Sequence, residues 1–285
     1  MNVNLFIVGT PKSGTTSLYN ALEGCEEIAL PLVKEPNYFT RLEIKSEIEN
    51  GTSDAMIISK IQKKHIGLIE EEKIYLKNYE RNCKYSCDFS TSYSRYHEKA
   101  AKRIYNYNPS AKIIIMVREP LGRIISHYRM DKRIGYTNKD LNSLLESEIH
   151  KIGNTTYLRD TDYQRIINSY KKYFNDILLI SFEDRIATNN NLLKIELERF
   201  LDTGLDGFTL KKENEATEAR FEKINYLISM LGVKKFIRKY GGQRLKSIIR
   251  KLFYKKNAGK LNYRFSKEVK DKIDNLRNQY LEVIK

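Results

Sequence analysis

The chain has few cysteines and no long apolar run, and both shortages narrow the protein class. Its three cysteines, Cys25, Cys83 and Cys87, are odd in number and lack a matching His/Cys pair at metal-ligand spacing. A reducing compartment fits this usage best. No apolar stretch approaches the roughly 20 residues that cross a bilayer, and no basic segment precedes the short apolar run at the N-terminus, so no signal peptide is expected.

The sequence also lacks an internal repeat, a low-complexity tract and a linker, so we expect one domain over residues 1–285. Against 36 acidic residues stand 51 Lys and Arg, a net charge of +15. This excess favours a polyanionic ligand, nucleic acid or an anionic membrane surface, although a solvated lysine-rich surface is the alternative. The Lys-, Asn- and Ile-rich composition, without a membrane anchor, predicts a bacterial cytoplasmic protein that contacts membranes at most peripherally.

Short apolar runs alternate with segments of helical periodicity along the chain. Residues 111–117 are β-branched and apolar without alternation, which is typical of a central parallel strand. Strands followed by helices predict an α/β fold, here a single three-layer domain with a central parallel sheet flanked by helices. The expected strands span 3–8, 85–88, 111–117 and 177–182, and the expected helices include 99–107, 121–133, 163–174 and 266–285, with helices and loops over 41–80.

The loop after the first predicted strand has the frame of a phosphate-binding loop. Residues 9–16 are GTPKSGTT, with Thr-Thr where a nucleotide triphosphatase has Lys-Thr or Lys-Ser, and Lys12 lies inside the loop instead. Backbone N–H groups of such a loop and of the following helix cradle anions, and we expect Thr15 or Thr16 to cap that helix. The alternatives are an ordinary turn or a P-loop kinase, but we find no convincing acidic strand end for magnesium.

Two segments carry a family resemblance. Residues 11–18, PKSGTTSL, resemble the 5'-phosphosulfate-binding loop of sulfotransferases that use 3'-phosphoadenosine 5'-phosphosulfate (PAPS). Residues 117–128, VREPLGRIISHY, resemble the family's 3'-phosphate-binding segment, in which Arg118 and Ser126 would hold the 3'-phosphate. A guanidinium binds phosphate bidentately, which agrees with this role, while an ion pair of Arg118 with a helix acid is the alternative. The likeness is closest to Golgi-type and bacterial carbohydrate sulfotransferases.

The resemblance implies PAPS as donor, the corresponding bisphosphate PAP as product, and no metal. Lys12 would be the electrostatic catalyst that neutralises the leaving group. Glu35, in LVKEPNYF, resembles the catalytic base of glycan sulfotransferases, although Asn37 stands where many of them have His. The alternative for Glu35 is a surface residue beside Lys34. Asp88, in DFSTSY, would orient the acceptor or Lys12, or else cap a turn.

A loosely similar basic loop near the C-terminus adds Lys256 and Lys260 as candidate phosphate contacts, with a solvated lysine run as the alternative. The predicted donor-binding residues are Pro11, Lys12, Ser13, Gly14, Thr15, Thr16, Ser17, Arg118, Ser126, Lys256 and Lys260.

The expected reaction is in-line transfer of a sulfuryl group to a hydroxyl or amine, with a carbohydrate or glycolipid as the favoured acceptor. Small alcohols, lipids and peptide tyrosines are further acceptor classes. A P-loop kinase would instead require ATP and magnesium. A non-catalytic protein that binds nucleic acid or a membrane surface through the basic stretch 234–260 is the third hypothesis. The two donor segments argue against it, so we expect no nucleic-acid partner.

Overall fold

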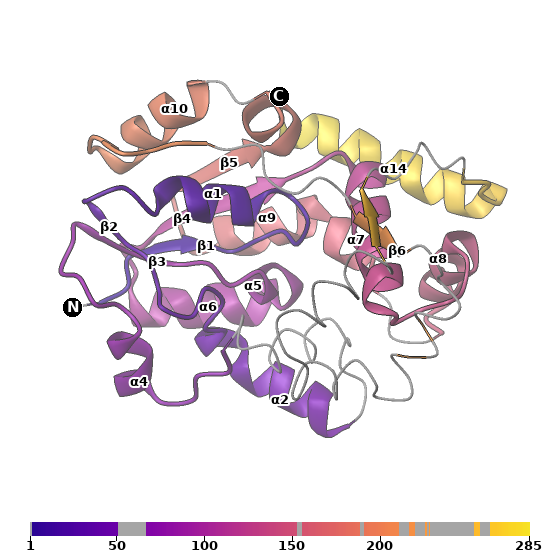
Figure 1. Cartoon of the computed structure of the whole chain (residues 1–285), viewed down its shortest axis with the longest axis horizontal. Coiled ribbons are helices and arrows are strands. Elements are labelled where there is room, and N and C mark those ends of the chain that lie inside the picture. Colours follow the sequence, from indigo (N-terminus) through magenta and orange to yellow (C-terminus); the bar gives the residue numbers. More distant parts are fainter. Residues whose placement is uncertain are drawn as a thin grey trace.

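A computed structural model describes residues 2–50, 67–152, 156–188, 191–210 and 263–285 (Figure 1). It also describes positions 226 and 228 and the backbone of two short strands, β6 (Thr217–Ala219) and β7 (Tyr254–Lys256), which pair antiparallel. The basic stretch 234–260 lies outside the described residues apart from that backbone, and so does Lys260. No helix in the described ranges is long and apolar enough to cross a membrane.

The central sheet has five parallel strands in the order β2-β3-β1-β4-β5. Each of the four predicted strands is present within two residues of its expected ends. The fifth, β2, was not predicted because two residues are too short to show a pattern. The strands are β1 (Leu5–Ile7), β2 (Ile28–Ala29), β3 (Tyr85–Asp88), β4 (Lys112–Val117) and β5 (Ile177–Ser181).

Ten α-helices lie in the described ranges, and the amphipathic segments predicted at 99–107, 121–133 and 266–285 are among them. The helix expected over 163–174 ends earlier, at Lys171. The helices are α1 (Thr15–Leu22), α2 (Arg41–Glu49), α4 (Glu72–Lys77), α5 (Ser92–Arg95), α6 (His97–Tyr107), α7 (Pro120–Ile134), α8 (Leu141–Ile149), α9 (Tyr163–Lys171), α10 (Leu192–Leu201) and α14 (Lys267–Val283).

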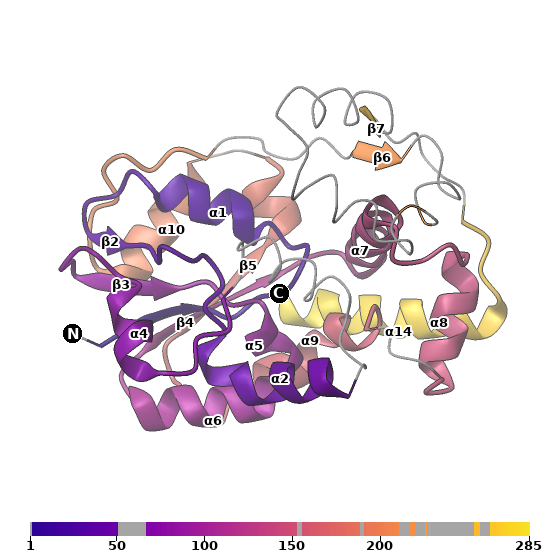
Figure 2. The ribbon, with the colours of Figure 1, turned by 60° about the horizontal axis from the view of Figure 1, so that its bottom comes forward.

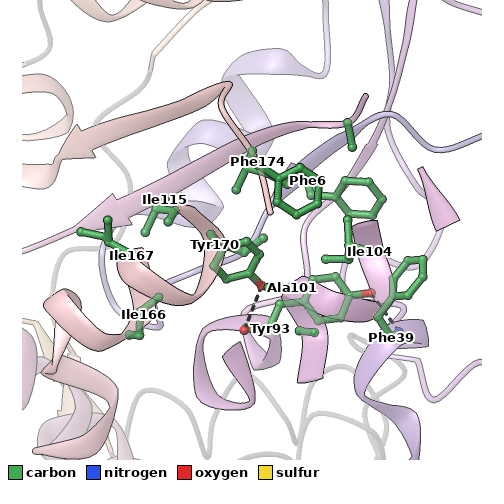
Figure 3. Close-up of a cluster of buried hydrophobic side chains, with 14 of the residues drawn as sticks. Phe6, Phe39, Tyr93, Ala101, Ile104, Ile115, Ile166, Ile167, Tyr170 and Phe174 are labelled. Carbon is green, nitrogen blue, oxygen red and sulfur yellow. Dashed lines mark hydrogen bonds between the residues drawn. The ribbon is translucent and has the colours of Figure 1, made fainter. Parts of the chain in front are cut away.

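Both faces of the sheet are covered by helices, because side chains alternate between the faces along each strand. Phe6 packs with α6 and α9 on one face, in the cluster drawn in Figure 3, whereas Leu5 and Ile7 pack with α1 and α10 on the other. In Figure 2, α1 and α10 lie above the sheet and α6 below it. The predicted three-layer α/β architecture with a parallel sheet is therefore confirmed.

A third cluster joins α7, α8 and α14 beside the sheet. Val269, Ile273 and Leu276 of α14 are buried in it, while Tyr280, one turn further on, reaches the cluster under α6 and α9. These four side chains recur every three or four residues in the sequence, the spacing of one face of an amphipathic helix. The last helix thus ties the outer helices to the central core.

Candidate active site

The carboxyl ends of the strands bring the predicted site residues together. The chain leaves β1 toward β2 and β3 on one side and reaches β4 and β5 on the other, so the loop after β1 lies at a topological switch point. Asp88 ends β3, and Arg118 directly follows β4. Residues separated by 30 to 109 positions in the sequence therefore share one edge of the sheet, the edge that faces α7 in Figure 1.

The loop 9–14 is anchored to β4. Thr10 donates its backbone N–H to the carbonyl oxygen of Met116 at 2.8 Å, and its hydroxyl lies 2.7 Å from that of Ser13. Ser13 is fully buried, so its side chain shapes the loop from inside. This bonding fixes where the backbone N–H groups of the loop point.

The N-terminus of α1 presents backbone donors with no side chain bound over them. Gly14 is the N-cap, and no side chain bonds to the helix start, so the predicted threonine cap is wrong. Gly14 has φ +89°, and a Cβ atom there would lie 2.9 Å from Cδ2 of Phe182. Only glycine fits, because it lacks the Cβ and tolerates this conformation. The N–H groups without a side-chain cap and the positive end of the helix dipole suit an anion such as a phosphosulfate.

Lys12 belongs to the loop, and its side chain reaches α7. Its ammonium group is 3.7 Å from the sulfur of Met130, and its carbonyl oxygen accepts a 3.0 Å hydrogen bond from Nη1 of Arg118. The backbone of Lys12 has φ +73°, a conformation that turns the chain sharply at this point. Lys12 and Arg118, predicted from separate motifs, are thus in direct contact.

A second arginine, which the sequence analysis missed, supports the same loop. Arg123 on α7 is fully buried and donates to the hydroxyl of Thr161 at 2.6 Å, to the carbonyl of Tyr157, and to the carbonyl of Pro11 at 3.4 Å. Buried charged groups persist only where such partners satisfy them. Its position beside buried Ile124 on α7 was the available signal, because it falls on the apolar face of that helix.

The surroundings of the Arg118 guanidinium suit the binding of an anion. Its guanidinium lies 4.2 Å from the centre of the Phe182 ring, and its Nε is 3.8 Å from Oε1 of Glu183. Burial lowers the pKa of this guanidinium. Within the described residues its buried Nε donates no hydrogen bond. The expected alternative, an ion pair with an acid, is present with Glu183, but it leaves donor capacity for a phosphate oxygen.

Ser126 lies partly exposed on α7, the helix that starts two residues after Arg118. The carboxylate of Glu119 caps this helix by accepting from the backbone N–H groups of Leu121 at 3.1 Å and Gly122 at 2.6 Å. The strand end, the cap and the first turns of α7 therefore form one rigid segment, and the phosphate contact of Ser126 stays a prediction.

The two predicted acids occupy one buried cluster. Glu35 is 5% exposed and accepts a 2.9 Å hydrogen bond from the hydroxyl of Thr91. Asp88 is fully buried and accepts from three hydroxyl groups at 2.6 to 2.8 Å. Burial, with a further contribution from the charge of Glu35, raises the pKa of Asp88 to about 6. The donors to Asp88 are Tyr75, Ser90 and Tyr93.

Asn37 fixes the segment that carries Glu35. It adopts the left-handed conformation, φ 54°, which asparagine tolerates better than most residues. Its side-chain amide donates to the carbonyls of Glu35 at 2.9 Å and Gly67 at 3.0 Å, and its side-chain oxygen accepts from Ser92 at 2.5 Å. At this position the family pattern has His, and here asparagine acts as a clamp for the candidate base.

Lys34 connects the same segment to the anion cradle. Its ammonium group donates to the hydroxyl of Thr16 at 2.7 Å and lies 5.6 Å from the centre of the Tyr19 ring on α1. The Glu35 segment is therefore tethered beside the start of α1. In the sequence Lys34 stands out only as a neighbour of Glu35, because a lysine on a loop gives no signal of its partner.

These features define a class, an α/β domain with a glycine-containing loop and an uncapped helix start after its central strand. Residues 4–194 match a family model described as "Sulfotransferase family", and the chain belongs to that family. It is an enzyme of this family, which implies a nucleotide sulfo donor, in general PAPS. No curated protein sequence matched the chain.

One solved structure supports the fold, and two further sulfotransferase domains show a weaker likeness. A sulfotransferase from Alicyclobacillus acidocaldarius is 21% identical, with a TM-score of 0.61 over 84% of this chain and 96% of that one. The sulfotransferase domain of the curacin biosynthetic pathway is 17% identical, with a TM-score of 0.49, covering 97% of this chain and 98% of that domain. The sulfotransferase domain of the Synechococcus PCC 7002 olefin synthase is 17% identical, with a TM-score of 0.49, covering 98% of this chain and 95% of that domain.

Proposed function

We propose that this enzyme transfers the sulfuryl group of PAPS to a hydroxyl or amine of a carbohydrate or glycolipid acceptor. One observation carries the proposal: the uncapped N-terminus of α1, Lys12 and the Arg118 guanidinium converge at one edge of the sheet. Three groups that favour negative charge, with Arg118 bonded to the backbone of Lys12, match a donor that carries phosphate at both ends.

The donor would lie along this edge with its 5' end at the loop after β1 and its 3' end at the start of α7. Backbone N–H groups of the loop and of Thr15, Thr16 and Ser17 would bind the 5'-phosphosulfate. Arg118 and Ser126 would bind the 3'-phosphate, about two helical turns apart along the same rigid segment. Lys256 and Lys260 stay predictions, because their side chains lie outside the described residues.

Glu35 would accept the acceptor's proton as the acceptor oxygen or nitrogen attacks sulfur in line with the leaving phosphate. As the bond between sulfur and the bridging oxygen breaks, Lys12 would neutralise the charge that forms on that oxygen of PAP. Asp88 accepts three hydroxyl hydrogen bonds in a fully buried position, which supports a positioning role beneath Glu35. The carbohydrate acceptor rests on the likeness of the Glu35 segment to glycan sulfotransferases.

The test is calorimetric titration with PAP in EDTA, on the wild type and on Arg118→Ala. We expect metal-free binding that weakens at least about tenfold in the variant, since a charge-assisted bidentate contact contributes about 1.5–3 kcal/mol. Arg199→Ala, an exposed arginine on α10, is the matched control and should bind PAP as the wild type does. Binding that requires magnesium-ATP instead of PAP would overturn the proposal.

A further inference from the structure

The C-terminal helix α14 lies beyond the segment that matches the family model, yet it contacts the site. It packs against α7, α8 and α9 (Figure 2). Two of its polar side chains, Tyr280 and Arg277, reach the residues that flank Arg118. Neither contact is part of the donor-binding segments identified from the sequence.

Tyr280 fixes the acid that faces Arg118. Its hydroxyl donates to Oε2 of Glu183 at 3.0 Å, and the backbone N–H of Glu119 donates to the same oxygen at 3.1 Å. The other oxygen of Glu183 lies 3.8 Å from Nε of Arg118. Since Tyr280 is 5% exposed and its ring is packed in the core, the Glu183 carboxylate is held in one orientation.

Arg277 secures the start of α7. Its Nε donates to Oε1 of Glu119 at 2.7 Å, and Glu119 is the side chain that caps this helix. The same helix carries Ser126. Through the two carboxylates, α14 therefore contacts both sides of the Arg118 segment.

We propose that Tyr280 and Arg277 are positioning residues for the 3'-phosphate end of the donor, acting through Glu183 on Arg118 and through Glu119 on α7. A held guanidinium loses less conformational freedom on binding, so the phosphate binds more tightly. The binding site for the 5' end of the donor is held by different contacts, the hydrogen bonds of Thr10 to the carbonyl of Met116. This inference rests on the proposed function, because it takes Arg118 as the ligand of the 3'-phosphate.

The experiment compares two nucleotides that differ only in the 3'-phosphate, PAP and adenosine 5'-monophosphate, by calorimetry. Tyr280→Phe keeps the ring and removes the hydroxyl. We expect about three- to tenfold weaker PAP binding, the range for one lost hydrogen bond, with affinity for the monophosphate unchanged. Arg277→Met should weaken PAP binding by about two- to threefold, since its ion pair is partly exposed. Tyr85→Phe, which loses a buried hydroxyl at the opposite end of β3, is the matched control.

A double-mutant cycle separates the possible failures. If Tyr280 acts through Arg118, Tyr280→Phe should have no further effect on PAP binding in the Arg118→Ala background. An equal loss for both nucleotides, an unchanged affinity for PAP, or an additive loss in the double variant would overturn the inference while leaving the proposed function intact. If Arg118→Ala does not reduce the preference for PAP over the monophosphate, the proposed function is overturned, and this inference with it.

Discussion

At the scale of single residues, Lys12 is the side chain on which the proposed chemistry depends most directly. Lys12 is part of the loop that forms the proposed anion cradle, and its ammonium would stabilise charge that develops only as the leaving group departs. Lys12→Met should therefore lower the turnover of PAPS to PAP by about 10²–10³, the range for losing one preorganised electrostatic contact. Affinity for PAP should fall much less.

Turnover is measured as release of PAP with an acceptor found by screening or, without one, with water. Lys132→Met, a change at an exposed lysine hydrogen bond on α7, serves as the control and should leave turnover unchanged. A large loss of PAP affinity with unchanged turnover would assign Lys12 to ground-state binding instead.

Asp88 predicts a pH dependence of stability. Its pKa, about 6 in the folded protein, exceeds the value of about 3.9 expected in the unfolded chain. The folded state therefore binds more protons between these values, so the free energy of unfolding falls as pH rises from about 4 to about 6. The full effect is up to about 3 kcal/mol for a difference of roughly two pKa units.

Urea unfolding of the wild type and of Asp88→Asn across this range isolates the effect, because the amide does not titrate. We expect the stability of the wild type to decline relative to the variant as pH rises. A difference between the two proteins that stays constant from pH 4 to 7 would show that Asp88 does not carry this raised pKa.

At the scale of elements, the junction of the loop with α1 depends on Gly14. Gly14→Ala would place a methyl group against Phe182 and Ile186 in a left-handed conformation. The conformation alone costs about 1–2 kcal/mol. We expect lower stability together with weaker PAP binding, because the start of α1 must shift. Gly204→Ala is the matched control, since a Cβ there meets no atom within 4 Å. Thermal unfolding and calorimetry measure both effects, and equal behaviour of the two variants would contradict the prediction.

The sequence predicted those elements whose pattern is local. The apolar run of β4 and the spacing of Val269, Ile273, Leu276 and Tyr280 in α14 are visible without a partner, and both are confirmed. Motif likeness also placed Lys12 and Arg118 at one site, where they are in contact. What local pattern could not show were contacts made by polar side chains across the fold. The clamp formed by Asn37, the buried Arg123 and the contact of Tyr280 with Glu183 depend on partners up to 112 positions away.

At the scale of the whole molecule, the site draws on the three largest hydrophobic clusters of the described residues. Leu18 of α1 lies in the cluster on one face of the sheet, Val117 of β4 in that on the other, and Ile124 of α7 in the third. A ligand that holds the starts of α1 and α7 against the sheet would therefore stabilise the three clusters together. One domain over residues 1–285 stays a prediction, and it implies that the three clusters unfold together.

Saturating PAP should raise the midpoint of a single unfolding transition, measured calorimetrically in EDTA. At a free concentration of 100 times the dissociation constant, the added stability is about 2.7 kcal/mol, which corresponds to a shift of several degrees for a chain of this size. The shift should be lost in Arg118→Ala at the same PAP concentration, because weaker binding lowers the linked stability. If two transitions appear and PAP moves only one, the chain consists of separate folding units, and the donor site belongs to one of them.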